Sequence, residues 1–287
     1  MSLGLNKTKR RISSIESTQK ITKAMEMIAT VKLKGFKDSF EASEAYLKDM
    51  TSLLSCLFNY DEDTKSHYYK ENDEAKGTLY IVITSSLGLC GGYNSNIFKY
   101  VESIVDKEND YILPIGEKGR SYFKRDKDYK NPRIPDLDFD FTTSAKDLYL
   151  AANILKNMFN EGKVKKIVIV YTHYVNSLSF IPEQVNLLPL SLEYKPSENE
   201  LICPPLFNPS PREALHLILV QYLAGLINGK VVESRLSEFA SRRNATENAN
   251  DNADELLSQL RIEYNKARQS AITQEIVEVV GGANASK

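Results

Sequence analysis

A glycine-rich turn is the first place in this sequence whose residue types could do chemistry. The segment Gly88-Leu89-Cys90-Gly91-Gly92-Tyr93-Asn94 follows an apolar, β-branched run that ends at Thr84, and a phosphate-binding loop occupies this position in many α/β folds. The spacing gives neither G-x-G-x-x-G nor a Walker A motif with its Gly-Lys-Ser/Thr. We therefore interpret the glycines as allowing a tight turn between a strand and a helix, and nucleotide binding as the alternative.

Cys90 in this turn is the one candidate nucleophile, and a thiol needs a nearby base to act as one. The chain has three histidines, His67, His173 and His216, and none forms a recognisable motif with Cys90. The three cysteines are odd in number and widely spaced, at Cys56, Cys90 and Cys203. This pattern predicts buried thiols in a reducing compartment rather than a disulfide framework or a zinc site. The sequence predicts no catalytic residue, no metal site and no bound cofactor.

Basic residues are concentrated at the start of the chain. Residues 1–37 carry nine Lys or Arg against two acidic residues, a local charge of +7, although the whole chain has a net charge of −1. This surface could bind nucleic acid, form a solvated helix face or face an acidic protein partner. Without interleaved aromatic residues or a recognition module, nucleic acid ranks last of the three.

Two long helical segments must position these groups. The C-terminal segment has an N-cap serine at Ser210, Pro211 at the first helical position and Glu213 at the capping-box position. Gly281-Gly282 is the expected C-terminal stop. A helix between these ends would extend roughly 100 Å, and it needs a packing partner because propensity alone does not stabilise it. No run is long and apolar enough to predict a membrane span.

Residues 5–58 form the expected partner. Their apolar stripe runs through Ile12, Ile15, Ile21, Met25, Ile28, Val31, Leu33, Phe36, Phe40, Tyr46, Leu47, Met50, Leu53, Leu54 and Leu57. The facing seam of the terminal helix is predicted at Ala249, Ala253, Leu256, Leu260, Tyr264, Ala267 and Ala271. Residues 233–280 carry nine acidic and six basic residues, so the two segments have opposite charge. We expect an antiparallel coiled coil of the two chain ends, with the helix around Met25–Lys34 beside residues 240–260.

The middle of the chain has a different period. Short apolar runs at Thr78–Thr84, Tyr111–Ile115 and Lys166–Tyr174 alternate with helical patterns near 94–107, 117–124 and 144–160, which predicts an open, Rossmann-like α/β sheet. The fold class is therefore α/β, with the sheet domain inserted between two coiled-coil helices. The expected division is a first helix over 1–60, a linker over 61–76, an α/β domain over 77–205 and a terminal helix over 206–287.

Four motifs resemble the gamma subunits of F-type ATP synthases, in order along the whole chain. They are Thr18-Gln19-Lys20-Ile21-Thr22-Lys23-Ala24-Met25-Glu26-Met27, the glycine turn with Asn94-Ser95-Asn96, Glu233-Ser234-Arg235 with Ser237-Glu238 and Ala240-Ser241-Arg242, and Tyr264-Asn265-Lys266-Ala267-Arg268-Gln269 continuing to Ala283. Several long motifs in register are more specific than any one of them.

The resemblance implies a non-catalytic rotor shaft that transmits torque and binds no small-molecule substrate. Its partners would be the alpha- and beta-type subunits of the catalytic hexamer, an epsilon-type accessory subunit and a proteolipid ring, at the cytoplasmic face of a bacterial membrane. The matched motifs place the partner-binding residues at Lys20, Lys23, Met25, Arg268, Gln269, Thr273 and Glu275. Of these, Arg268, Gln269 and Thr273 can share much of one helix face, on a part of the helix expected to extend beyond its partner.

Some positions depart from the family pattern. Ser86-Leu87 stands where the family usually has Asp-Arg, Arg243 and Thr246 replace methionines, and Asn250 replaces a threonine. These changes suggest an alternative within the family, a divergent rotary ATPase not used for ATP synthesis. The more distant alternatives are a nucleotide-dependent α/β enzyme with a coiled-coil arm and a coiled-coil nucleic-acid or scaffold protein.

Overall fold

The computed structural model describes residues 2–58, 67–72, 75, 77–125, 129–130, 144–191 and 210–285. It divides into two compact units, each containing part of both terminal helices. We call Met1–Val31 with Arg242–Lys287 the two-helix unit, and Lys32–Ser241 the sheet unit.

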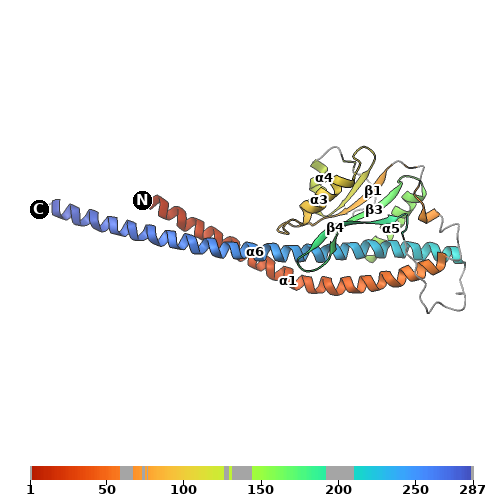
Figure 1. Ribbon diagram of the computed structural model, residues 1–287, viewed down its shortest axis with the longest axis horizontal. Coiled ribbons are helices and arrows are strands. Elements are labelled where there is room, and N and C mark those ends of the chain that lie inside the picture. The colour runs from red at the N-terminus through yellow and green to blue at the C-terminus, as the bar shows by residue number, and fades with distance from the viewer. Residues whose placement is uncertain are drawn as a thin grey trace. The chain divides into compact units, whose positions relative to one another are not determined.

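The sheet unit is built on four strands, β1 (Thr78–Ile83), β2 (Tyr111–Ile115), β3 (Lys166–Tyr174) and β4 (Phe180–Leu188). Their order is β2-β1-β3-β4, and Figure 1 labels β1, β3 and β4. The first three strands are parallel, and β4 pairs with β3 in the antiparallel sense. The three parallel strands are those predicted from their β-branched runs.

Three shorter helices join the strands, α3 (Tyr93–Ile104), α4 (Glu117–Arg125) and α5 (Ala145–Asn160). Their bounds agree with the predicted helices within a few residues. Helix α5 begins with a capping box, in which the Ser144 hydroxyl accepts a hydrogen bond from the Asp147 amide and the Asp147 carboxylate accepts from the Ser144 amide.

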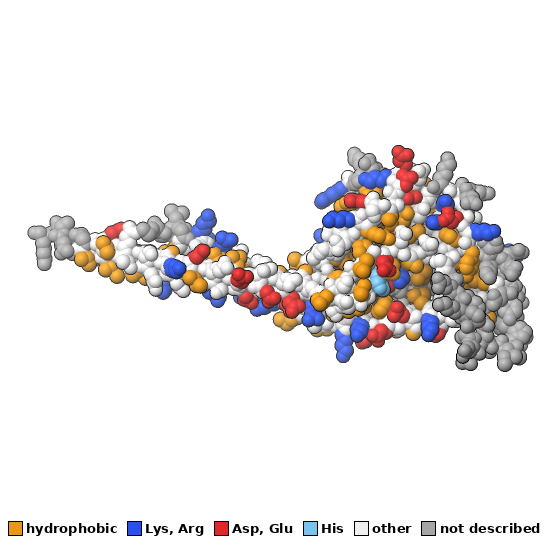
Figure 2. All heavy atoms as spheres, in the orientation of Figure 1, with side chains coloured by type: hydrophobic (Ala, Val, Ile, Leu, Met, Phe, Trp, Pro, Cys, Tyr) orange, Lys and Arg blue, Asp and Glu red, His pale blue; other side chains and the backbone are white. Residues whose placement is uncertain are grey.

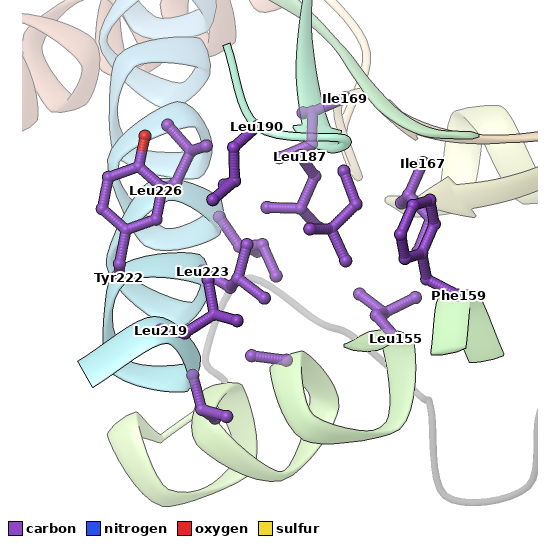
Figure 3. Packing of buried hydrophobic residues seen from close by; sticks show 14 of the residues in the cluster. Leu155, Phe159, Ile167, Ile169, Leu187, Leu190, Leu219, Tyr222, Leu223 and Leu226 are labelled. Atoms are coloured by element: carbon purple, nitrogen blue, oxygen red, sulfur yellow. The ribbon is translucent and has the colours of Figure 1, made fainter. Parts of the chain in front are cut away.

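Strand residues alternate between two hydrophobic layers, as expected for a sheet covered on both faces. On one face, a small cluster packs α3 and α4 against the sheet through Tyr80, Val82, Ile97, Ile112, Phe123, Val168 and Val170. On the other face, a larger cluster joins the sheet to α5 and the two long helices. Figure 3 shows Leu155 and Phe159 of α5 and Leu219 and Leu223 of the terminal helix converging on this layer.

Strand β4 was not predicted. It contains Pro182, which has no amide hydrogen and argues against a central strand. All its residues before Leu187 are partly buried or exposed. Both properties suit an edge strand, and β4 lies at one edge of the sheet beside β3.

The long helices are α1 (Ser2–Phe58) and α6 (Pro211–Ala285). The predicted N-cap is present, because the Ser210 hydroxyl accepts from the Glu213 amide at 3.3 Å. The predicted stop at Gly281-Gly282 is wrong, since α6 continues through both glycines to Ala285. Two glycines weaken a helix without necessarily ending it.

Within the sheet unit, α1 and α6 run antiparallel and close together. Phe36 stacks on Phe239 with ring centroids 5.1 Å apart. Further along, a Cβ added to Gly229 would lie 2.8 Å from Leu47 Cδ1 and 3.0 Å from Ser43 Oγ. The absence of a side chain at Gly229 therefore permits this close approach.

Within the two-helix unit, hydrogen bonds fix the same antiparallel sense. The Gln19 amide donates to the Asn250 carbonyl at 3.5 Å, and Arg261 donates to the Glu16 carboxylate at 2.7 Å. The less exposed residues of α1 recur at steps of three and four, at Thr8, Ile12, Ile15, Gln19, Thr22, Glu26 and Ala29. Those of α6 do the same, at Thr246, Asn250, Ala253, Leu257, Leu260 and Tyr264. This spacing is that of a coiled coil.

The predicted seam is therefore partly wrong. Ala249 and Ala267 are exposed, whereas Asn250 and Leu257, which the prediction left out, are buried. The predicted Leu260 is buried. The prediction assigned mainly apolar residues to the seam, whereas several seam positions of the two helices are occupied by polar residues. In α1 the same error placed five exposed residues in the stripe, at Ile21, Ile28, Val31, Tyr46 and Leu53.

The division into a helix over 1–60, a linker over 61–76, a domain over 77–205 and a helix over 206–287 stays a prediction. Most of the linker, the proline-rich segment before Ser210 and Cys203 lie outside the described residues.

Candidate coupling surfaces

The predicted partner-binding residues of α6 lie at the surface of the two-helix unit. Arg268, Gln269, Thr273 and Glu275 are all exposed. The Thr273 hydroxyl donates to the Gln269 carbonyl at 2.9 Å, so its hydrogen is used within the helix. The guanidinium, amide and carboxylate of the other three are the groups that could reach a partner.

In α1 the corresponding residues are less uniform. Lys20 and Lys23 are exposed, and Met25 is half-buried. The two ammonium groups can therefore meet an acidic partner, whereas much of the methionine is already covered by the chain itself.

Large apolar residues accompany the polar ones. Ile272, Ile276 and Val279 are 47%, 57% and 71% exposed, and their spacing of four and three places them along one side of α6. In α1, Ile21 and Ile28 are 61% and 50% exposed and lie seven residues apart. Figure 2 shows hydrophobic side chains reaching the surface along these helices. Lines of exposed apolar side chains on two neighbouring helices indicate a protein-binding surface.

The glycine turn lies in the sheet unit at the carboxyl end of β1. Gly91 has φ 55° and Leu89 has φ 60°, both in the left-handed region. The turn packs against α6, where the Ser241 hydroxyl donates to the Cys90 carbonyl at 2.8 Å and the Tyr93 hydroxyl lies 3.0 Å from Ser234 Oγ. This is the end of the sheet at which α/β proteins bind ligands, and here the helix α6 contacts it.

Cys90 is 3% exposed. Its sulfur accepts a hydrogen bond from the Asn94 amide at 3.3 Å and lies 3.7 Å from Ser85 Oγ. None of these groups is a base that could take the thiol proton, so the described contacts give Cys90 a structural role in the turn. Among the described residues no group of three His, Cys, Asp or Glu side chains could hold a metal ion.

Helix α6 is more apolar than the sequence analysis expected. In the described part of the chain it is the one helix with an 18-residue window apolar enough to cross a membrane, at a mean hydropathy of 1.5, and 44% of that window is buried. Its residues Leu215, Leu219 and Leu223 are fully buried in the core of the sheet unit. Packing in this core accounts for the buried part of the apolar stretch.

Comparison with known proteins decides the family. A family model described as ATP synthase matches residues 4–285. The ATP synthase gamma chain of Malacoplasma penetrans is 38% identical over 97% of this chain and 98% of that protein. The chain belongs to the ATP synthase gamma chain family. The gamma chain of Alkaliphilus metalliredigens is 35% identical over the full length of both proteins.

Solved structures agree with the gamma-chain fold. A chain in the Euglena gracilis mitochondrial ATP synthase (OSCP/F1/c-ring, rotational state 3) aligns with a TM-score of 0.67 and 20% identity, covering 99% of this chain and 95% of that one. A chain in the Tetrahymena thermophila mitochondrial ATP synthase (central stalk/c-ring) has a TM-score of 0.58 and 24% identity over 80% of this chain and 99% of that one.

One group of residues was noticed in the sequence only as a family motif. Glu233, Ser234 and Ser237 are buried between α6 and the sheet. The sequence contained a signal for these contacts, namely polar residues close together in an apolar part of the helix. Buried polar residues of this kind require hydrogen-bonding partners.

Proposed function

We propose that this gamma chain is the central rotor shaft of an F-type rotary ATPase and passes torque between a catalytic hexamer and a membrane ring. The observation that carries this proposal is the exposed line Ile272, Ile276 and Val279 beside Arg268 and Gln269. Apolar side chains exposed in this way do not stabilise a monomeric protein, whereas a helix inside a ring of subunits would bury them.

The alpha- and beta-type subunits are the partners proposed for the two-helix unit. Lys20, Lys23 and Met25 of α1, with Arg268, Gln269, Thr273 and Glu275 of α6, are the proposed contact residues. Charged and polar groups around an apolar line set the partner's register, and the apolar line supplies most of the contact energy. The solved relatives come from assemblies described as rotor, F1 and c-ring.

The sheet unit is the proposed site for an epsilon-type accessory subunit and for the proteolipid ring. The whole assembly would be peripheral to the membrane, at its cytoplasmic face in a bacterium. The chain itself would be non-catalytic, and ATP would be bound by its partners. In support of this, the glycine turn lacks the spacing of a phosphate-binding loop and contacts α6 through Ser241 and Tyr93.

Co-expression with alpha- and beta-type subunits tests the proposal. We expect a purified complex that hydrolyses ATP and rotates a bead fixed to the exposed Lys99 position of α3. The isolated chain should bind no ATP in titration calorimetry, because it supplies no phosphate cradle. A micromolar nucleotide site in the isolated chain, or a hexamer that hydrolyses ATP without turning the bead, would contradict the proposal.

A further inference from the structure

One face of α6 in the sheet unit is polar and yet buried. Glu233, Ser234 and Ser237 are 2%, 0% and 0% exposed, and Ser241 is 8% exposed. Ser237 follows Glu233 by four residues and Ser234 by three, and Ser241 follows Ser237 by four, so these side chains lie along one side of the helix. Apolar residues normally fill such a face, so each of these polar groups needs a specific partner.

Two of the serines hold a single residue of β3. Ser234 Oγ accepts from the Thr172 amide at 3.1 Å, and the Ser237 hydroxyl donates to the Thr172 carbonyl at 3.1 Å. The paired residues of β1 and β3 end at Val82 and Val170, so Thr172 lies beyond the last of them. Helix α6 therefore supplies the hydrogen bonds for both backbone groups of this residue.

Glu233 adds a buried charge to the same face. Its carboxylate accepts from Lys230 Nζ at 2.9 Å and from the Tyr174 amide at 3.4 Å, and it lies 2.5 Å from His173 Nδ1. Lys230 also donates to the Tyr171 hydroxyl at 3.0 Å. A buried carboxylate without such partners is strongly destabilising, so this arrangement favours one position of α6 against β3.

The row of buried polar side chains on α6, from Glu233 to Ser241, ends at the glycine turn. The Ser241 hydroxyl donates to the Cys90 carbonyl at 2.8 Å. Eight residues separate Glu233 from Ser241, which corresponds to about 12 Å of helix. Directional contacts therefore hold α6 at two places along its axis, on β3 and on the turn that follows β1.

Directional contacts resist rotation in a way that apolar contacts do not. Apolar burial depends on area and has no preferred direction, so a helix held by leucines alone turns through small angles at little cost. Hydrogen bonds weaken steeply once their geometry is bent. Turning α6 about its axis would bend the bonds to Thr172, His173 and Cys90 together.

We propose that Glu233, Ser234, Ser237 and Ser241 form a rotational lock between α6 and the sheet. These are positioning residues that keep the helix and the sheet domain turning as one body under torsion. The inference rests on the proposed rotor function and adds to it the place where torque passes from the helix into the sheet.

The test is the torsional stiffness of the assembled complex. A bead is fixed to Lys99→Cys on α3, the hexamer is held between steps, and the angular fluctuation of the bead is recorded. The lock variants are Ser234→Ala with Ser237→Ala, and Glu233→Gln. The matched control is Leu223→Val, which weakens the apolar packing of the same helix. Each complex is measured at a temperature that lies equally far below its own melting temperature.

We expect the variance of the bead angle to rise at least about twofold in the lock variants, because the bonds that they lose are the directional ones. The control should keep the wild-type variance. The variant Ser237→Thr retains a hydroxyl at this position, so it should also keep the wild-type variance. Unchanged variance in the lock variants, or an equal rise in the control, would overturn the lock.

The two proposals fail in different ways. A wild-type complex that never turns the bead contradicts the rotor function, whereas rotating lock variants with wild-type variance contradict only the lock. If the double serine variant does not assemble, Ser241→Ala at the other end of the row carries the same test with the same two outcomes.

Discussion

The Asn250 side-chain amide donates a hydrogen bond to the Glu26 carboxylate at 2.6 Å, inside the two-helix unit. Asn250 is 5% exposed, and its side-chain oxygen also bonds the hydroxyl of Thr22, which is 9% exposed. Buried polar residues in a coiled coil specify which residues face each other, at some cost in stability. A slip of either helix by one heptad would bring Asn250 opposite Ile15 or Ala29 instead of Thr22.

Removing one partner of this layer should be more harmful than removing the whole layer. Asn250→Ala removes the amide that donates to the Glu26 carboxylate, while the Thr22 hydroxyl keeps its bond to the Gln19 carbonyl. We expect a loss of about 1–3 kcal/mol in the free energy of unfolding. Asn250→Leu combined with Glu26→Leu and Thr22→Val should recover most of this loss. Denaturant unfolding measures both, and equal losses in the two proteins would contradict the argument.

Glycines in different environments should respond in opposite directions to alanine. Gly116 has φ +91°, and a Cβ there would lie 2.2 Å from the Thr84 carbonyl oxygen, so Gly116→Ala should cost at least about 1–3 kcal/mol. Gly35 lies within α1 with nothing within 4 Å of its Cβ position, so Gly35→Ala should stabilise by up to about 1 kcal/mol. Thermal unfolding of the two variants compares these effects, and a stabilised Gly116→Ala protein would refute the conformational argument.

Stability should decline at alkaline pH through buried tyrosines. Burial raises the pKa of Tyr222 to about 12, against the opposing effect of its hydrogen bond to Thr51. The unfolded chain loses this proton near pH 10, so stability is fully present below pH 10 and falls between about pH 10 and 12. We expect the melting temperature of Tyr222→Phe to decline less steeply across this range. Parallel slopes for the two proteins would show that Tyr222 does not contribute.

Replacing Arg268 and Gln269 with alanine should spare folding and lower coupled turnover. Both residues are exposed, so the isolated chain should unfold at the wild-type temperature. Charge-assisted contacts contribute about 1.5–3 kcal/mol each at most, so we expect a partial loss of ATPase rate and torque in the assembled complex. Wild-type values would show that torque passes mainly through packing.

The variant Ile272→Ser with Ile276→Ser separates the two kinds of contact. These side chains supply apolar area in the same part of α6, and their loss removes packing while leaving Arg268 and Gln269 in place. We expect a larger drop in torque than for the polar pair, because apolar area supplies most of the energy of a protein interface. A smaller drop would assign torque mainly to the polar contacts.

The sequence was most informative where local patterns coincide with packing. The strands β1 and β3 lie in the middle of the sheet and are mostly buried, so their apolar, β-branched runs are nearly continuous and easily read. Ser144 and Ser210 start helices by capping them, which depends only on neighbouring residues. These parts of the fold follow from short-range chemistry.

The missed features depend on tertiary contacts. Strand β4 includes Pro182 and is recognisable only once β3 offers it a partner. The seam of α6 passes through Asn250 rather than Ala249, because Thr22 and Glu26 of α1 satisfy the asparagine. Glu233 reads as an ordinary helix glutamate until His173, Lys230 and the Tyr174 amide are found around it. In each case the partners are remote in the chain, apart from Lys230, which lies three residues before Glu233.

Helices that meet every three or four residues alternately wind around each other in a left-handed sense. In the two-helix unit, the run from Thr8 to Ala29 and the run from Thr246 to Tyr264 both have this spacing. Such a pair is not equivalent to its mirror image. Twisting it in one sense overwinds the two helices and presses their seam together, whereas twisting it in the other sense pulls the seam apart. The pair is therefore a chiral spring, stiffer against one sense of rotation than against the reverse.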